Sequence, residues 1–139
     1  MKILFAADGS AYTQRALDYL VMHDWLRAGN QICVFYAALP VPHRAADMAG
    51  RALTHHYYED EAEQVMRPIR ERLAGAHIEA EYAHVAGHTA ESIVQKAEAG
   101  GFDLIVMGSH GHGALAGVVM GSVATRVLAS CKVPVLLIR

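Results

Sequence analysis

The stretch that decides the fold is LIVMGSHGHGALAGVVMGS, residues 104–122. It opens on a continuous apolar run, Leu104 to Met107, which is typical of a strand buried on both faces of a parallel sheet. A glycine-rich segment follows, and Gly121-Ser122 then opens a helical stretch that ends near Ser130. A strand, a glycine-rich connection and a helix in this order predict one unit of an open parallel α/β sheet.

Three further apolar runs have the character of buried parallel strands, because each is short, nearly continuous and bounded by turn residues. They are Ile3 to Ala7, Ile32 to Leu39 and Val133 to Ile138. A fourth run, Ile78 to Val85, alternates apolar residues with glutamates, as expected of a strand with one less deeply buried face. We therefore expect this run at an edge of the sheet.

Helical periodicity fills the intervals between these strands. Apolar residues recur at three-and-four spacing from Thr13 to Ala28, and this stripe should pack on the sheet. A second helix is predicted from about Leu53 to Leu73, with a bend or a break just before Pro68. A third helix is predicted over Thr89 to Ala99, with Thr89 as its N-cap and Gly100-Gly101 as its stop. The last helix is predicted over Ser122 to Ser130.

Strand and helix therefore alternate four times before a final strand. This order predicts one α/β domain, residues 1–139, built on an open five-stranded parallel sheet with helices on both faces. The segment Leu39 to Arg51 has no clean periodicity and is expected to form a long, mobile connection. It begins at the carboxyl end of a strand, where ligands of such sheets bind.

The composition argues against several classes of protein. The 139 residues carry a formal net charge of -2 with acidic and basic residues mixed, so the basic footprint of nucleic-acid binding is missing. The N-terminal apolar run ends at Asp8, too soon for a signal sequence or a membrane span, which predicts a cytoplasmic protein. With 53% hydrophobic residues, the chain should hide much of its surface, as a dimer would. Cys33 and Cys131 are interpreted as reduced packing residues.

The glycines after Met107 have two interpretations. Glycine lets the backbone approach a ligand closely, and consecutive N–H groups at a helix N-terminus supply donors for phosphate oxygens. A flexible turn between strand and helix would need the same glycines, so both interpretations stay open. A P-loop is excluded because the chain has no Gly-Lys pair. A dinucleotide fingerprint fails because residues 111–116 match only in part and no acidic residue follows about 20 positions later.

Taken with its surroundings, the segment resembles the universal stress protein family, whose nucleotide-binding members carry Gly-x-x-Gly, nine residues, and then Gly-Ser or Gly-Thr. Gly108, Gly111, Gly121 and Ser122 have this spacing in full. The other matching segments are Ile-Leu-x-x-x-Asp-Gly-Ser at residues 3–10, DLIVMG at 103–108 and Val-Pro-Val-Leu at 133–136. The resemblance implies a Rossmann-like, adenine nucleotide alpha hydrolase-like fold with strand order 3-2-1-4-5.

The resemblance also implies a nucleotide site. The carboxylate of Asp8 would accept hydrogen bonds from the ribose, although helix capping is another role open to it. Small or apolar residues would line the adenine pocket: Ala6, Ala7, Ala37 and Met107. Gly108 would approach the sugar. The phosphates would be held by the backbone groups of Gly111, Gly121, Ser122 and Val123. Mg²⁺ would bridge the phosphate oxygens.

The nine histidines do not by themselves predict a metal or catalytic site. His55 and His56 are adjacent and would point in different directions on a helix, whereas zinc ligands share a face. His110 and His112 lie beside the glycine motif and could donate to a phosphate, but a plain loop role is favoured for them. The acidic residues between 59 and 63 are interpreted as a solvated surface at the start of the second helix.

These observations predict a cytoplasmic, stress-related homodimer that binds ATP or a related adenine nucleotide and changes its conformation or partner preference on doing so. The dimer would pair through Val133 to Ile138, an apolar strand expected at a sheet edge. Two alternatives stay open: a slow ATPase or phosphotransferase, and an interaction module indifferent to nucleotide. Efficient hydrolase chemistry is not indicated, because neither a nucleophile elbow nor a Ser/His/Asp or Cys/His arrangement can be assembled.

Overall fold

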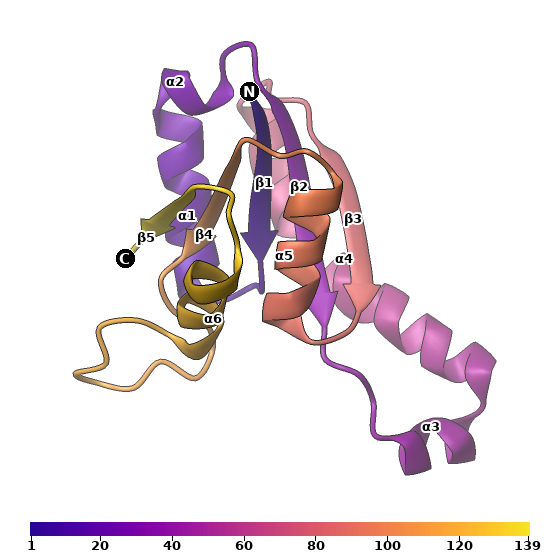
Figure 1. Ribbon diagram of the computed structural model, residues 1–139. Coiled ribbons are helices and arrows are strands. Elements are labelled where there is room, and N and C mark those ends of the chain that lie inside the picture. The colour runs from indigo at the N-terminus through magenta and orange to yellow at the C-terminus, as the bar shows by residue number, and fades with distance from the viewer.

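Five parallel strands form one sheet in the computed structural model, which describes residues 1–139 apart from the side chains of Ala46 and Ala49. The strands are β1 (Lys2–Ala7), β2 (Gln31–Ala38), β3 (Glu81–Ala86), β4 (Leu104–Gly108) and β5 (Val135–Ile138). Their order across the sheet is β3-β2-β1-β4-β5 (Figure 1). The predicted fold class and strand order are confirmed, and so are the edge positions of the third and last strands.

Helices cover both faces of this sheet. They are α1 (Ala11–Met22), α2 (Asp24–Arg27), α3 (His43–Ala49), α4 (Arg51–Gly75), α5 (Thr89–Ala99) and α6 (Ser122–Ser130). Figure 1 shows α5 and α6 in front of the sheet and α1 and α4 behind it, while α3 projects away from the carboxyl ends of the strands. None of the helices in the described chain is long and apolar enough to cross a membrane.

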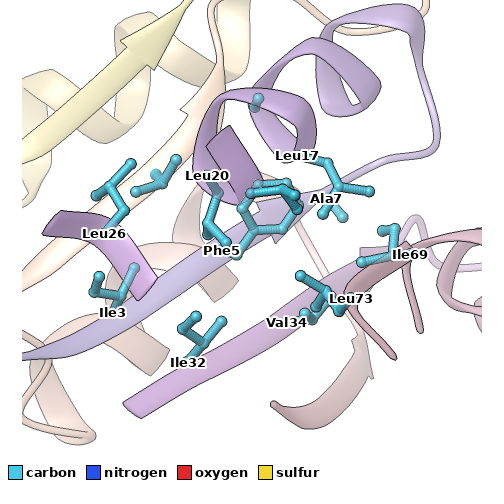
Figure 2. Packing of buried hydrophobic residues seen from close by; sticks show 13 residues of the cluster. Ile3, Phe5, Ala7, Leu17, Leu20, Leu26, Ile32, Val34, Ile69 and Leu73 are labelled. Carbon is cyan, nitrogen blue, oxygen red and sulfur yellow. The ribbon is translucent and has the colours of Figure 1, made fainter. Parts of the chain in front are cut away.

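The side chains of β1 serve both faces of the sheet. Ile3, Phe5 and Ala7 pack toward α1 and α4. Leu4 and Ala6, which alternate with them, pack toward α5 and α6. Phe5 has no exposed surface and lies among Leu17 and Leu20 of α1 (Figure 2), with Ile69 and Leu73 of α4 in the same cluster. Burying a large apolar side chain stabilises the fold by about 1.5–3 kcal/mol, so β1 anchors both layers.

The first helix ends earlier than predicted, because His23 leaves the helical conformation with φ -114° and ψ 109°. Its ring nitrogen Nδ1 lies 2.7 Å from the carbonyl oxygen of Tyr19, and the two rings stack at 3.8 Å. The His23 side chain therefore bonds the carbonyl oxygen of Tyr19, which would accept a backbone N–H if the helix continued. The apolar stripe continues in α2, where Leu26 is fully buried.

The middle of the chain differs from the prediction in three respects. The segment expected to be irregular contains α3, and α4 begins at Arg51, so the acidic residues between 59 and 63 lie well inside that helix. Helix α4 also continues through Pro68 without a break. Pro68 is exposed, whereas Met66, Ile69 and Leu73 are buried against the sheet, and this packing holds the helix together across the missing hydrogen bond.

The boundaries of the third strand and of α5 also differ from the prediction. Ile78 does not start the strand, because its N–H donates to Leu73 O at 2.9 Å and closes the C-terminus of α4, with His77 at φ 56°. Thr89 is the first helical residue of α5 and not its N-cap, a position that His88 occupies. Gly100 ends α5 as predicted.

Gly108 brings the end of β4 against the start of α1. A Cβ at this position would lie 2.6 Å from the Cβ of Tyr12 and 3.0 Å from its carbonyl carbon. Contacts this short are not seen for real Cβ atoms, so only glycine allows α1 to cross β4 so closely. The approach places the first turn of α1 beside the carboxyl ends of β1 and β4.

We predict that Gly108→Ala lowers the free energy of unfolding by about 1–3 kcal/mol, because the added methyl must push α1 away from β4. Gly75→Ala is the matched control, since a Cβ there meets nothing within 4 Å and alanine is favoured in a helix. Urea denaturation of the two variants measures the difference. Equal stability of both would contradict the close approach at Gly108.

Candidate functional site

A cavity of about 760 Å³ lies at the carboxyl ends of the central strands. Every residue that the sequence analysis assigned to a nucleotide site borders it: Ala6, Ala7, Asp8, Ala37, Met107, Gly108, Gly111, Gly121, Ser122 and Val123. Their contact with a nucleotide stays a prediction. The structure brings them together because the carboxyl ends of parallel strands meet at one edge of the sheet.

The floor of the cavity is formed by small side chains on neighbouring strands. Ala6 lies between Phe35 of β2 and Met107 of β4 in the strand register. Ala37 is buried two residues further along β2. Because alanine fills little of the space above a strand, this floor can accept a flat apolar group.

Asp8 follows β1, and the turn into α1 holds one of its carboxylate oxygens. Its Oδ1 accepts hydrogen bonds from the Ser10 N–H at 2.8 Å and from the Thr13 hydroxyl at 2.7 Å. The Asp8 N–H in turn donates to Thr13 Oγ1 at 3.0 Å. Ser10, and not Asp8, is the N-cap of α1. Asp8 Oδ2 has no hydrogen-bond partner among the described residues and is left free to accept one from a ligand.

The glycine loop, residues 109–121, passes over Asp8 at Gly111. A Cβ built on Gly111 would lie 2.7 Å from Asp8 Oδ2. Gly121 closes the base of the loop, because its N–H donates to Ser109 O at 2.8 Å. A Cβ at Gly121 would stand only 3.1 Å from the Cα of His110. The two glycines are therefore required by close backbone approaches and not only by flexibility.

The N-terminus of α6 faces the same cavity. Gly121 is its N-cap, and no side chain caps it. The N–H groups of Ser122 and Val123 belong to the first helical turn, which has no intrahelical acceptors, and no other hydrogen bond of the described residues uses them. These donors and the positive end of the helix dipole favour an anion at this side of the cavity.

Both histidines of the glycine loop make hydrogen bonds. His110 Nε2 donates to Val118 O at 2.7 Å, so in the neutral ring Nδ1 accepts the hydrogen bond from the Ser109 hydroxyl at 2.8 Å. His112 Nε2 donates to Asp8 O at 2.6 Å. Each histidine therefore has a specific structural role in the loop, because His110 bonds Val118 O and His112 bonds Asp8 O.

Sequence reasoning missed the residues that α4 and α5 bring to the cavity. Thr89 and Ile93 of α5 border it on one side of the sheet, and Tyr36 of β2 with Glu61 of α4 borders it on the other. Burial, and then the negative charge of Glu61, raises the pKa of Tyr36 to about 12. Which helical turn lies over a strand end depends on packing, so apolar periodicity alone could not have identified these side chains.

The other candidate ligands lie outside the cavity. His55 Nε2 and His56 Nδ1 approach the carboxylate of Glu59 at 3.1 Å and 3.8 Å on the exposed surface of α4. Within the described part of the chain, no three His, Cys, Asp or Glu residues are grouped to hold a metal. Cys33 and Cys131 are free thiols, and burial raises the pKa of Cys33.

The site combines three chemical features. An apolar floor suits a flat ring, Asp8 Oδ2 accepts hydrogen bonds from hydroxyl groups, and the backbone donors of the glycine loop and α6 suit anionic oxygens. The cavity lies where the chain crosses from β3 to β4, on the other side of β1. This is the topological switch point at which open α/β sheets bind ligands. The fold and cavity together define a doubly wound α/β protein with a glycine-lined cavity at its switch point.

The comparisons with known proteins make the class specific. The model of the universal stress protein family matches residues 1–139, and the chain belongs to this family. A universal stress protein of Thermus aquaticus is 33% identical over 99% of this chain and 97% of its own length. Universal stress protein Slr1230 of Synechocystis is 32% identical over 99% of this chain, which spans only 42% of that relative.

Solved structures agree with the fold. MJ0577 of Methanocaldococcus jannaschii superposes with a TM-score of 0.79 at 27% identity, covering 99% of this chain and 94% of that one. Universal stress protein UspA of Lactobacillus plantarum has a TM-score of 0.77 at 19% identity, covering 100% and 97% of the two chains. The second likeness concerns the fold alone.

We predict that Thr13→Val destabilises the protein by about 1–3 kcal/mol, because the buried hydroxyl bonds both the N–H and the carboxylate of Asp8. Thr13→Ser keeps a hydroxyl at the same place and should recover most of the loss. Chemical denaturation of the two variants gives the comparison. A Thr13→Val variant as stable as the wild type, beside a destabilised Thr13→Ser, would mean that the methyl group of Thr13, and not its hydroxyl, matters at this position.

Proposed function

We propose that this chain binds ATP or a related adenine nucleotide in the cavity, and that it acts in the cytoplasm as a nucleotide-responsive dimer in a stress response. The observation that carries the proposal is the geometry around Asp8. Oδ1 is held by the β1–α1 turn, while Oδ2 is free and has Gly111 in front of it. A Cβ at Gly111 would lie 2.7 Å from Oδ2, so the absence of a side chain there keeps this oxygen open to a ligand. A ribose hydroxyl suits this free acceptor.

The two ends of the cavity suit the rest of the nucleotide. The alanine floor beside Met107 would take the adenine ring, and the N–H groups of Gly111, Ser122 and Val123 would hold the phosphates. The N–H of Gly121, also expected to hold a phosphate, instead donates to Ser109 O. A magnesium ion would bind to the phosphate oxygens of the nucleotide, because Mg²⁺ prefers hard oxygen ligands. It would neutralise phosphate charge there and help to orient the phosphate chain.

Solved relatives support the adenine nucleotide class more than they support ATP itself. One universal stress protein structure is a complex with cAMP, an Arabidopsis thaliana family member has AMP bound, and one from Archaeoglobus fulgidus is in complex with dAMP. Their TM-scores are 0.68, 0.70 and 0.72. The shared part of these ligands is adenine on a pentose that carries a phosphate, which agrees with a site that offers an apolar floor, a carboxylate and the backbone donors of the glycine loop.

We predict that the purified protein, freed of any nucleotide by unfolding and refolding, binds Mg-ATP with a micromolar Kd in calorimetry, a free energy of about 8 kcal/mol. Gly111→Ala should weaken binding at least about tenfold, because the added methyl would lie 2.7 Å from Asp8 Oδ2 and obstruct a ribose hydroxyl that donates to it. Gly113→Ala is the matched control from the same loop, since a Cβ there meets nothing within 4 Å.

Two outcomes of the same titration would overturn the proposal. If the wild-type protein binds neither ATP nor AMP nor cAMP, the interaction-module alternative is favoured. If phosphate is released at a rate of order 1 per second or faster, the protein belongs with enzymes and not with binding proteins. A preparation of Gly111→Ala made in parallel controls for a contaminating ATPase, because its turnover should be lower only if the activity belongs to this chain.

The dimer part of the proposal rests on the edge strand β5. It pairs with β4 on one side, and its four residues are only partly buried. Edge strands with apolar side chains and free backbone groups are prone to pair with another chain. Leu128 of α6 is 44% exposed, so the neighbouring helix face is open as well. A second copy placed along Val133 to Ile138 would cover the edge strand.

We predict that sedimentation equilibrium gives a mass of twice 15.1 kDa for the wild-type protein. Val135→Pro should shift the population toward monomer, because proline removes an N–H group and disfavours pairing at an edge. Circular dichroism checks that this variant remains folded. A wild-type protein that stays monomeric at high micromolar concentration would contradict the dimer.

A further inference from the structure

We propose that His112 is a positioning residue for the nucleotide: its side chain clasps the glycine loop onto the β1–α1 turn and so sets the position of Gly111 beside Asp8 Oδ2. The clasp is the hydrogen bond from His112 Nε2 to Asp8 O at 2.6 Å, which joins residues 104 positions apart in the sequence. The inference rests on the proposed function, because Oδ2 is the atom to which a ribose hydroxyl would donate.

The clasp does not depend on the charge of the imidazole. A carbonyl oxygen only accepts hydrogen bonds, so His112 Nε2 must carry the hydrogen. It does so in the neutral Nε2–H tautomer and in the protonated ring alike. The side chain can therefore hold the loop in either protonation state, and it leaves the carboxylate of Asp8 available to a ligand.

The glycine loop is braced internally, so a single attachment can hold much of it. Gly121 N–H donates to Ser109 O at 2.8 Å at the base of the loop. His110 Nε2 reaches across it to Val118 O at 2.7 Å, and Val118 N–H donates to Leu115 O at 3.2 Å. These bonds join both halves of the loop to each other and not to the rest of the protein.

The outer part of the loop has few other attachments. Among the hydrogen bonds of the described residues, the one from His112 to Asp8 is the only one that joins residues 111–120 to a residue outside the loop. Met120, next to the base of the loop, packs against the core, but apolar packing does not hold Leu115 and Val119, which are 73% and 82% exposed. Loss of the clasp should therefore free the outer loop while its base, and the core beneath, stay in place.

Asp8 is a rigid anchor for the clasp. Its N–H and its Oδ1 are both bonded to Thr13, and Ser10 N–H also donates to Oδ1. Thr13 is buried, with 4% of its surface exposed. Because the main chain and one carboxylate oxygen of Asp8 are fixed in this way, attaching His112 to Asp8 O also fixes Gly111 relative to Oδ2. A preorganised site of this kind loses less conformational entropy when a ligand binds.

The test compares two replacements of similar length. His112→Gln keeps an N–H donor that can reach Asp8 O, whereas His112→Met has none. The first readout is backbone ¹⁵N relaxation of the nucleotide-free proteins at Gly111, Gly113 and Gly117. We expect order parameters near the rigid value of about 0.85 in the wild type and in His112→Gln, and values below about 0.6 in His112→Met. Equal order parameters in all three proteins would overturn the clasp.

The second readout is the affinity for Mg-ATP and its rate of dissociation. We expect His112→Met to raise the Kd and the dissociation rate about tenfold, the order expected when one hydrogen bond is lost, and His112→Gln to stay within about threefold of the wild type. If both variants weaken ATP binding equally while the loop stays rigid, the imidazole contacts the phosphates directly and the clasp is wrong. If the wild type does not bind nucleotide but the relaxation results hold, the proposed function fails and the structural clasp survives.

Discussion

Close backbone packing around Asp8 is the constraint on which the rest of the structure depends. Gly108, Gly111 and Gly121 each lie where a Cβ would meet another group at 3.1 Å or less. At Gly108 that group is the first turn of α1, at Gly111 it is Asp8 Oδ2, and at Gly121 it is the backbone at the start of the loop. Because these side chains are absent, β4, α1 and α6 can converge on one carboxylate. The same contacts that close the fold at this edge therefore shape the cavity.

The strands were readable from the sequence for a physical reason. Strands β1, β2 and β4 are buried on both faces, so they show as continuous apolar runs. The alternation that indicated the third strand lies mostly in residues 78–82, at and before the start of the partly exposed β3. Their order needed the family resemblance, because nothing in an apolar run says which neighbour it pairs with. Once the order is known, the carboxyl ends of β1, β2 and β4 must lie together. This explains why the residues predicted for the site all border one cavity.

The failures of prediction have a common origin in packing between distant segments. Pro68 remains inside α4 because Ile69 and Leu73 are buried on the far side of that helix, which local propensity does not reveal. Glu61 reaches the cavity because α4 extends beyond the strand ends, and its effect on the pKa of Tyr36 follows from that contact. The hydrogen bond of His112 likewise joins two loops that are adjacent only because β1 and β4 pair.

The hydrogen bonds at the base of the glycine loop give the proposed nucleotide response a route to the proposed dimer. Ser109 O accepts from Gly121 N–H, while Ser109 N–H donates at 2.8 Å to the carbonyl oxygen of Ile138, the last residue of β5. One peptide segment therefore joins the start of α6, beside the expected phosphates, to the edge strand along which a second copy would pair. A ligand shifts such an equilibrium only if it binds one arrangement better than the other. Phosphate oxygens that bind the N–H groups of Ser122 and Val123 would favour the arrangement in which α6 begins beside Ser109, and would thereby hold the carboxyl end of β5 in register.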